Sequence, residues 1–262
     1  MTRHDEEDLT PMAGRGTVSA LTMMQFDTQS SREVVLRALS TSRLFRGVDR
    51  AFLETLAPSA SIYRLEQGNC LWRRGTRAEH FHVIIRGILE LQRAATGPES
   101  TLVALFGPGE SPAIPVTLER RPFIADALAT TPVLEVLRVR AEPILAALPH
   151  DADLGVAMTR ALLDHCKLIH SKVDVLVAGT VPRRLAAFML DLAERFGDEG
   201  LDGTTFVPLA LSRAQYAAYV AARVETVIRV CSAWQKSGLL TSAKDGFTLR
   251  SLDELRAILA SR

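Results

Sequence analysis

The chain has 262 residues, of which 47% are hydrophobic and 23% are charged, an ordinary globular composition with room for one to three domains. Lysine and arginine (31) nearly balance aspartate and glutamate (30), which excludes a uniformly basic protein, so any nucleic-acid-binding surface must be local. The three scattered cysteines exclude a disulfide scaffold and suit the cytoplasm. We expect no membrane span, because no apolar run is long enough, and no secretion signal, because the first residues are acidic.

Residues 1–32 are polar and rich in small residues, without a sustained apolar period, which predicts a disordered extension. A misplaced start codon is an equal alternative, because Met12, Met23 and Met24 lie inside this segment. In residues 33–57, leucine and phenylalanine recur at helical spacing, which predicts short helices at the start of a domain covering 33–150.

The sequence pattern changes between residues 60 and 140. Short stretches such as "FHVIIRGILELQR" and "PVLEVLRV" alternate or run apolar, and glycine and proline separate them. Many short strands with such turns predict an antiparallel barrel or sandwich.

Residues 151–178 predict one long helix with a coiled-coil seam. Leu162, Ile169 and Leu176 recur at one heptad position, and Thr159, Cys166 and Val173 recur at another. The seam that we expect consists of Leu162, Cys166, Ile169, Val173 and Leu176. A second copy of the chain is the simplest partner, which predicts a homodimer, and packing on its own domain is the alternative.

Residues 179–262 end the chain with a pattern of helices and turns. Ser212 and Gln215 form a capping-box pattern, so a helix is expected from Arg213 to about residue 220. A second helix is expected from near Arg223 to Lys236, which makes a helix-turn-helix. The Asp245-Gly246 dipeptide that follows predicts a β-hairpin, the wing of a winged helix.

The second of these helices carries the residues suited to reading DNA. Glu225 can accept a hydrogen bond from cytosine, and Arg229 can donate two to guanine. Four residues apart on a helix, both project the same way. Ser212 and Arg213, at a helix N-terminus, suit phosphate contact. The alternative for Glu225 and Arg229 is an ordinary i,i+4 salt bridge on a solvated face.

The ordered set of segments from residue 37 to 260 resembles the CRP/FNR family of bacterial transcription regulators. The segments are "GNCLWRRGTRAEHFHVIIRG", the long helix, "VPRRLAAFMLDLA", the helix-turn-helix and "DGFTLRSLDELRAI". The resemblance implies an α+β fold with a cyclic-nucleotide-binding-like antiparallel β-barrel of jelly-roll type over 33–150. A dimerisation helix over 151–178 and a winged helix-turn-helix over 179–262 would follow. The implied partners are double-stranded DNA, a second copy and, for an activator, RNA polymerase.

Within the family, "VETVIR" resembles the FNR branch, which implies a TTGA-type inverted repeat and control of anaerobic or nitrogen-oxide metabolism. Val224 replaces an arginine of CRP-like members. Ile228 replaces a serine, and it can only touch a thymine methyl, which puts the outer base in doubt. Ala221 stands where a glycine is usual, and a positive φ there would cost about 1 kcal/mol. The DNA-binding residues so implied are Ser212, Arg213, Arg223, Val224, Glu225, Thr226, Ile228 and Arg229.

The effector pocket that the resemblance implies contains His82, Gly109, Glu110, Phe123 and Ile124. Relatives that bind cyclic nucleotides carry an Arg-Ser pair where this chain has Phe123 and Ile124, so we do not expect a cyclic nucleotide, although Arg120 and Arg121 lie close by. An iron–sulfur cluster is not expected either, because residues 1–69 contain no cysteine.

Haem remains open as a cofactor, and no other metal site is expected. The candidate axial ligands are His80, His82, His165, His170, Cys70 and Cys166, each of which could instead be an ordinary surface or core residue. Cys166 could be a redox switch across the dimer axis or a small packing residue. A regulator without a ligand and an enzyme built on the barrel are the alternatives, but no catalytic motif is present.

Overall fold

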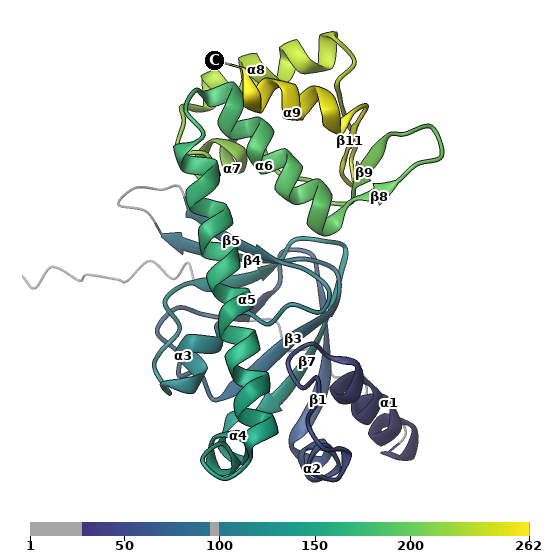
Figure 1. Ribbon diagram of the computed structural model, residues 1–262, viewed down its shortest axis with the longest axis vertical. Coiled ribbons are helices and arrows are strands. Elements are labelled where there is room, and N and C mark those ends of the chain that lie inside the picture. The colour runs from purple at the N-terminus through teal and green to yellow at the C-terminus, as the bar shows by residue number, and fades with distance from the viewer. Residues whose placement is uncertain (1–27, 95–99, 262) are drawn as a thin grey trace, which may run out of the picture.

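The computed structural model describes residues 28–94 and 100–261, which build a β-barrel, one long helix and a C-terminal domain (Figure 1). Residues 1–27, most of the expected extension, lie outside the described residues. The first helix begins at Thr28, inside the segment 1–32 assigned to that extension. No helix of the described residues is both long and apolar enough to cross a membrane.

Two antiparallel sheets form the barrel, with strand orders β1-β7-β3 and β2-β6-β4-β5. The strands are β1 (Ala60–Glu66), β2 (Cys70–Trp72), β3 (His80–Arg86), β4 (Leu89–Ala94), β5 (Ser100–Phe106), β6 (Asp126–Ala129) and β7 (Val133–Arg140). Side chains alternate across a strand, so β7 serves two cores. Leu134 and Val136 point into the barrel, whereas Leu137 and Val139 pack under helices outside it. The jelly-roll type expected from the resemblance is confirmed.

Short helices flank the barrel. They are α1 (Thr28–Thr41), α2 (Arg50–Leu56), the 3-10 turn η1 (Ala57–Ser59), α3 (Ile114–Leu118) and α4 (Ala141–Ala147). The long helix α5 (Ala152–Val177) follows, and Figure 1 shows it running along the barrel to the C-terminal helices. Asp151 caps α5, because its Oδ1 accepts a hydrogen bond from the Leu154 N–H at 2.9 Å. The single helix expected over 151–178 is therefore observed.

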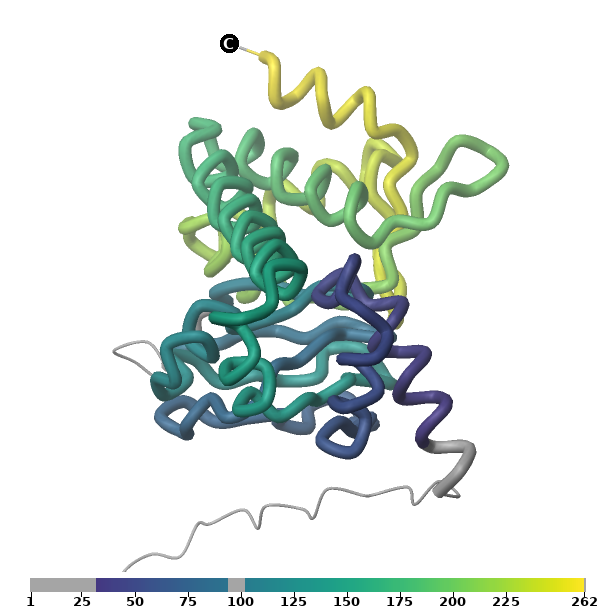
Figure 2. Tube along the Cα trace, turned by 60° about the horizontal axis from the view of Figure 1, so that its bottom comes forward, coloured from purple at the N-terminus to yellow at the C-terminus, as the bar shows by residue number. Residues whose placement is uncertain are grey.

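The described part of the C-terminal domain contains four helices and a four-stranded sheet of order β10-β11-β9-β8. Its elements are α6 (Val181–Phe196), β8 (Asp198–Glu199), β9 (Thr205–Val207), α7 (Arg213–Tyr219), α8 (Val224–Lys236), β10 (Leu240–Ser242), β11 (Phe247–Leu249) and α9 (Leu252–Ala260). In α7 and α8 we find the expected helix-turn-helix, and β10 and β11 pair as the expected hairpin. Figure 2 shows this domain lying above one end of the barrel, with the β8–β9 hairpin projecting from it.

One apolar core joins the barrel to the C-terminal domain. Ile88, Leu102 and Leu105 of the barrel are buried in the same cluster as Phe188 of α6 and Tyr216 of α7. Helix α7 packs directly on β5. The helix-turn-helix is therefore seated on the barrel rather than joined to it by the chain alone.

We predict that Ala221→Gly stabilises the protein, because Ala221 adopts φ 50°, the left-handed region that glycine tolerates and alanine does not. The expected gain in the free energy of unfolding is about 1 kcal/mol, measured by urea denaturation. Ala222→Gly is the control, since Ala222 has no positive φ, and it should stabilise nothing. A gain in the control equal to that of Ala221→Gly would contradict strain as the cause.

Candidate nucleic-acid interface

The first helix of the helix-turn-helix begins where its capping residues require. The Ser212 hydroxyl accepts a hydrogen bond from the Gln215 N–H at 3.2 Å, and the Gln215 side chain accepts one from the Ser212 N–H at 2.8 Å. Two N–H groups that a helix end would leave unpaired are thereby satisfied. This confirms the capping box expected from the sequence and sets the start of α7.

Two cations from neighbouring helices hold the turn between α7 and α8. Arg184 of α6 donates to the carbonyls of Val220 (2.7 Å) and Ala221 (3.0 Å). Lys172 of α5 donates to the Tyr219 carbonyl at 2.5 Å, and its Nζ lies 3.1 Å from the centre of the Tyr219 ring. Burial lowers the pKa of Lys172 to about 8. Because Lys172 belongs to the long helix, it joins α5 directly to the turn.

Helix α8 has a buried side and an exposed side. Val227 and Cys231 are fully buried in the domain core, as the sequence predicts for Cys231, and a hydrophobic back fixes the rotation of the helix. Glu225 and Arg229 are exposed on the other side. Within the described part of the chain neither of them forms an ion pair, so the i,i+4 salt bridge does not occur. Both charges are available to a partner.

The remaining residues that the sequence places at DNA divide into exposed and half-buried groups. Arg223, Ile228 and Ser212 are exposed, and Arg223 is the residue that precedes α8. Val224 and Thr226 are half-buried, and Val224 packs against the domain core.

Arg213 is tied to the wing. Its Nη2 donates to the Ser242 hydroxyl at 3.2 Å, to which Gln235 of α8 also donates at 3.1 Å. The Ala243 N–H closes the wing by donating to the Gly246 carbonyl at 2.8 Å. The two helices and the hairpin thus meet at one hydroxyl and form a single surface.

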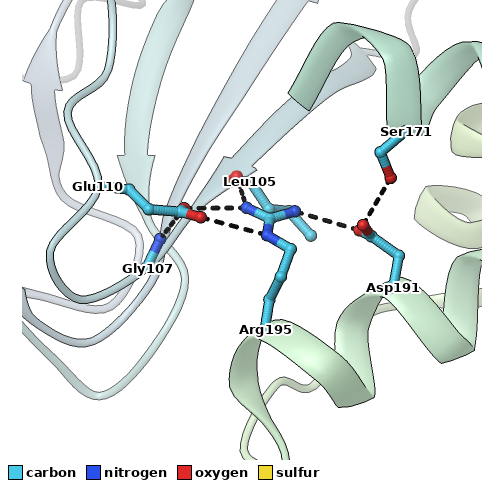
Figure 3. Close-up of polar contacts among 6 residues, drawn as sticks. All are labelled: Leu105, Gly107, Glu110, Ser171, Asp191 and Arg195. Atoms are coloured by element: carbon cyan, nitrogen blue, oxygen red, sulfur yellow. Dashed lines mark hydrogen bonds and ion pairs between the residues drawn. The ribbon is translucent and has the colours of Figure 1, made fainter. Parts of the chain in front are cut away.

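A cluster of polar contacts joins this domain to the barrel and to α5 (Figure 3). The guanidinium of Arg195 in α6 donates to Glu110 of the barrel at 2.9 and 3.3 Å. It also donates to Asp191 at 3.2 Å and to the Leu105 carbonyl at 2.6 Å. The Ser171 hydroxyl of α5 completes the cluster by donating to Asp191 at 2.5 Å. The barrel and the C-terminal domain are therefore linked by Arg195 itself, and α5 is linked to it through Asp191.

The Arg195 cluster is largely removed from water. The side chains of Arg195 and Glu110 are 16% and 19% exposed. Glu110 is further held because it accepts a hydrogen bond from the Gly107 N–H at 2.8 Å. Gly107 has no room for a side chain, since a Cβ would collide with the ring of Phe196. The sequence did not reveal this cluster, because Asp191 and Arg195 alone look like a surface i,i+4 pair.

A second polar contact crosses the same boundary. Glu90 of β4 is 3% exposed and accepts hydrogen bonds from Gln215 of α7 and Gln92, both at 2.7 Å. Burial raises the pKa of its carboxyl. Gln215 therefore contributes to both the cap of α7 and the seat of α7 on the barrel.

The five residues expected to form the effector pocket lie in separate places, and only two of them at a time share a cavity. Gly109 and Glu110 follow β5 and face α5 and α6, where Glu110 is committed to Arg195. His82 and Phe123 are buried on the other side of the barrel interior, beside Trp72. Ile124 is 59% exposed, because its side chain points away from the barrel.

The candidate haem ligands are dispersed. His80 and His82 are neighbours on β3, with ring centres 6.4 Å apart, whereas His165 and His170 lie on α5. The Cys70 thiol donates to the Trp72 carbonyl at 2.8 Å, and Cys166 is exposed on α5. In residues 28–94 and 100–261, no three histidine, cysteine or acidic side chains gather as a metal site would need.

Four of the five residues of the expected seam, Cys166, Ile169, Val173 and Leu176, are exposed on α5, and only Leu162 differs. Leu162 is half-buried against the helices beside the barrel, so it does not belong to an exposed stripe. The observed exposed apolar side chains are Val156, Leu163, Ile169, Val173, Leu176 and Val177. Leu163 therefore replaces Leu162, because contact with the barrel decides which side of α5 is covered.

Comparison with known proteins agrees with this architecture. Residues 63–151 match the cyclic nucleotide-binding domain, and residues 183–258 match the Crp-like helix-turn-helix domain. The chain is 28% identical over 193 residues to the transcriptional activator protein FnrA of Stutzerimonas stutzeri, covering 73% of this chain and 76% of FnrA. It belongs to the CRP/FNR family of transcription regulators.

Solved structures of this family share the fold. The regulator TTHB099 from Thermus thermophilus superposes with a TM-score of 0.64 at 19% identity, covering 76% of this chain and 96% of that one. FixK2 from Bradyrhizobium japonicum gives 0.64 at 20% identity, covering 78% and 98%. As a CRP/FNR regulator the chain is a DNA-binding protein. On α8, the exposed side chains of Glu225 and Arg229 form no ion pair within the described residues.

We predict that Glu110 and Arg195 are strongly coupled. In a double-mutant cycle of Glu110→Gln and Arg195→Met, the coupling energy should be about 1–3 kcal/mol, because little water screens the pair. Urea denaturation of the four proteins gives this value. The control is the pair Arg250 and Glu254, whose side chains are 50% and 47% exposed and whose coupling should stay below about 0.5 kcal/mol. Equal coupling in the two cycles would contradict the role given to the Arg195 cluster.

Proposed function

We propose that this regulator binds a TTGA-like inverted repeat as a homodimer, with Glu225 and Arg229 reading base edges in the major groove. The observation that supports this is the exposure of these two unpaired charges, one turn apart, on a helix whose opposite side is buried. A carboxylate can accept from the cytosine amino group, and a guanidinium can donate to both guanine acceptors. Both residues lie near the start of α8, the end that enters the groove in this motif.

The other residues of the proposed interface have supporting tasks. We infer that the exposed Arg223 and Ser212 contact phosphates, which position the domain without reading sequence. Arg213 keeps the wing next to α7 through Ser242. Ile228 is 46% exposed beside Arg229, so it presents an apolar surface to the neighbouring base. We infer that a thymine methyl is favoured at that position.

The proposed dimer forms along α5. Val156, Leu163 and Val177 are exposed, and with His170 they recur every seven residues. Cys166 and Val173 lie between them with the same period. Two such stripes can pack as a coiled coil, as the seam of a dimer requires. A pair of α8 helices related by the dimer axis would then enter successive major grooves, roughly 34 Å apart.

We further propose that the regulator acts in the cytoplasm as an activator that contacts RNA polymerase, by analogy with FnrA, and controls anaerobic or nitrogen-oxide metabolism. We do not expect it to turn over a substrate. A signal would act by changing the relative stability of two arrangements of α5 and the C-terminal domain. Lys172 and Arg195 support this route, because each joins α5 or the barrel to the DNA-reading domain.

We predict that Glu225→Ala and Arg229→Ala each weaken binding to a duplex containing the TTGA inverted repeat by roughly 5- to 150-fold, since each removes about 1–3 kcal/mol of base discrimination. Binding to a scrambled duplex should change much less. Gel shifts at fixed salt give both constants. Arg256→Ala is the control, because this exposed arginine lies on α9 and should leave both constants unchanged. Unaltered preference for the repeat in both variants would refute the assignment.

We predict that Leu163→Glu dissociates the dimer, because two buried carboxylates would then face each other across the seam. Sedimentation velocity should report a shift from dimer to monomer. Asp174→Lys is the matched control, since Asp174 is an exposed charged residue of the same helix outside the stripe. Its dimer should persist. A dimeric Leu163→Glu protein would show that α5 is not the interface.

A further inference from the structure

The mouth of the barrel holds a cavity of about 310 Å³ that none of the DNA-binding surface uses. It lies among β1, β2, β3, β7 and the segment before β6. Trp72, His82 and Phe123 line its inner part and are 8%, 4% and 6% exposed. Tyr63, His80 and Arg138 line its outer part. A volume of this size is at the small end of the range of known small-molecule sites.

The inner part is a rigid aromatic surface. The rings of Trp72 and Phe123 stack with centres 4.3 Å apart and planes 14° apart, and the His82 ring lies 4.8 Å from Trp72. Trp72 is held in place because its indole N–H donates to the Ala125 carbonyl at 3.1 Å. Such a surface favours a planar, apolar ligand group.

His82 leaves a polar atom without a partner in this surface. Its Nδ1 is buried and makes no hydrogen bond within the described residues. Burial, Arg138 and His80 together lower the pKa of His82 to about 3, so the imidazole is neutral and can carry its proton on Nδ1. A buried polar atom without a partner destabilises the folded protein, and a hydrogen-bond acceptor on a ligand would remove that cost.

Arg138 supplies an oriented positive charge. Its guanidinium donates to the Tyr63 hydroxyl at 2.9 Å and contacts His80 Nδ1 at 3.0 Å. No carboxylate of residues 28–94 or 100–261 pairs with it. At the rim, Arg77 is matched by Glu79, the one acidic side chain that lines the cavity in the described chain, and Arg73 lies 3.7 Å from the carboxylate of Asp126. The cavity therefore keeps a net positive charge, which Arg138 supplies.

We propose that this cavity binds a small aromatic carboxylate, with its ring against Trp72 and Phe123 and its carboxylate between Arg138 and His82. The guanidinium pairs with the carboxylate through charge-assisted hydrogen bonds. The Nδ1–H of His82 donates the remaining bond. The site is separate from α8, so it stands whether or not the DNA-reading assignment is correct.

Benzoate is the probe, and titration calorimetry of the full chain is the measurement. We expect saturable binding of benzoate, and binding at least tenfold weaker for acetate, which lacks the ring, and for benzyl alcohol, which lacks the charge. In the Trp234→Phe variant Trp72 is the sole tryptophan, so its fluorescence should change along the same titration curve. No saturable binding of benzoate, or equal binding of acetate or benzyl alcohol, overturns the proposal.

Two variants test the residues. Arg138→Gln should weaken benzoate binding at least tenfold, and His82→Phe, which keeps an aromatic ring but removes both ring nitrogens, should also weaken it. Arg74→Gln is the control, because this exposed arginine of the same segment does not line the cavity. Circular dichroism checks that each variant folds. If Arg138→Gln does not fold, the benzoate affinity of His82→Phe tests the proposal. Unchanged affinity in a folded Arg138→Gln or His82→Phe protein overturns the assignment.

Discussion

The guanidinium of Arg195 is the place where the barrel, the long helix and the C-terminal domain meet, and the relative position of all three depends on it. Its planar fork reaches Glu110 twice, Asp191 and the Leu105 carbonyl, a set of directions that the single ammonium of lysine could not match. Because the cluster is mostly buried, loss of the arginine would leave two carboxylates poorly solvated and unpaired. The arrangement is thus specific as well as stable.

Apolar packing and polar contacts have different tasks at this boundary. The shared core of Ile88, Leu102 and Leu105 with the C-terminal domain supplies non-directional adhesion. The bonds of Arg195 and Glu90 select one register from the many that adhesion alone would allow. Lys172 and Arg184 then extend this order to the turn of the helix-turn-helix. The orientation of α8 is consequently a property of the whole chain rather than of its last domain.

Local signals were enough to predict much of the fold and part of the site. The cap at Ser212 and the apolar back of α8 are set within a few residues, so the helix-turn-helix and the exposure of Glu225 and Arg229 were predictable. Which side of α5 meets the barrel depends on distant residues, and the seam was therefore misplaced at Leu162. The separation of Glu110 from Phe123 could not be predicted for the same reason, since only the folded barrel shows that they face different ways. Arg195 could not be identified, because its partner Glu110 is 85 positions away.

The core that Ile88, Leu102 and Leu105 share with the C-terminal domain has a consequence for protein engineering. Grafting the DNA-reading domain of a relative onto this barrel would need matched residues along β4 and β5, or apolar surface would be left in water on both halves. The barrel and the DNA-binding domain are therefore not freely interchangeable, although each matches a domain family of its own. Among related sequences, substitutions on β5 should accompany substitutions on α7.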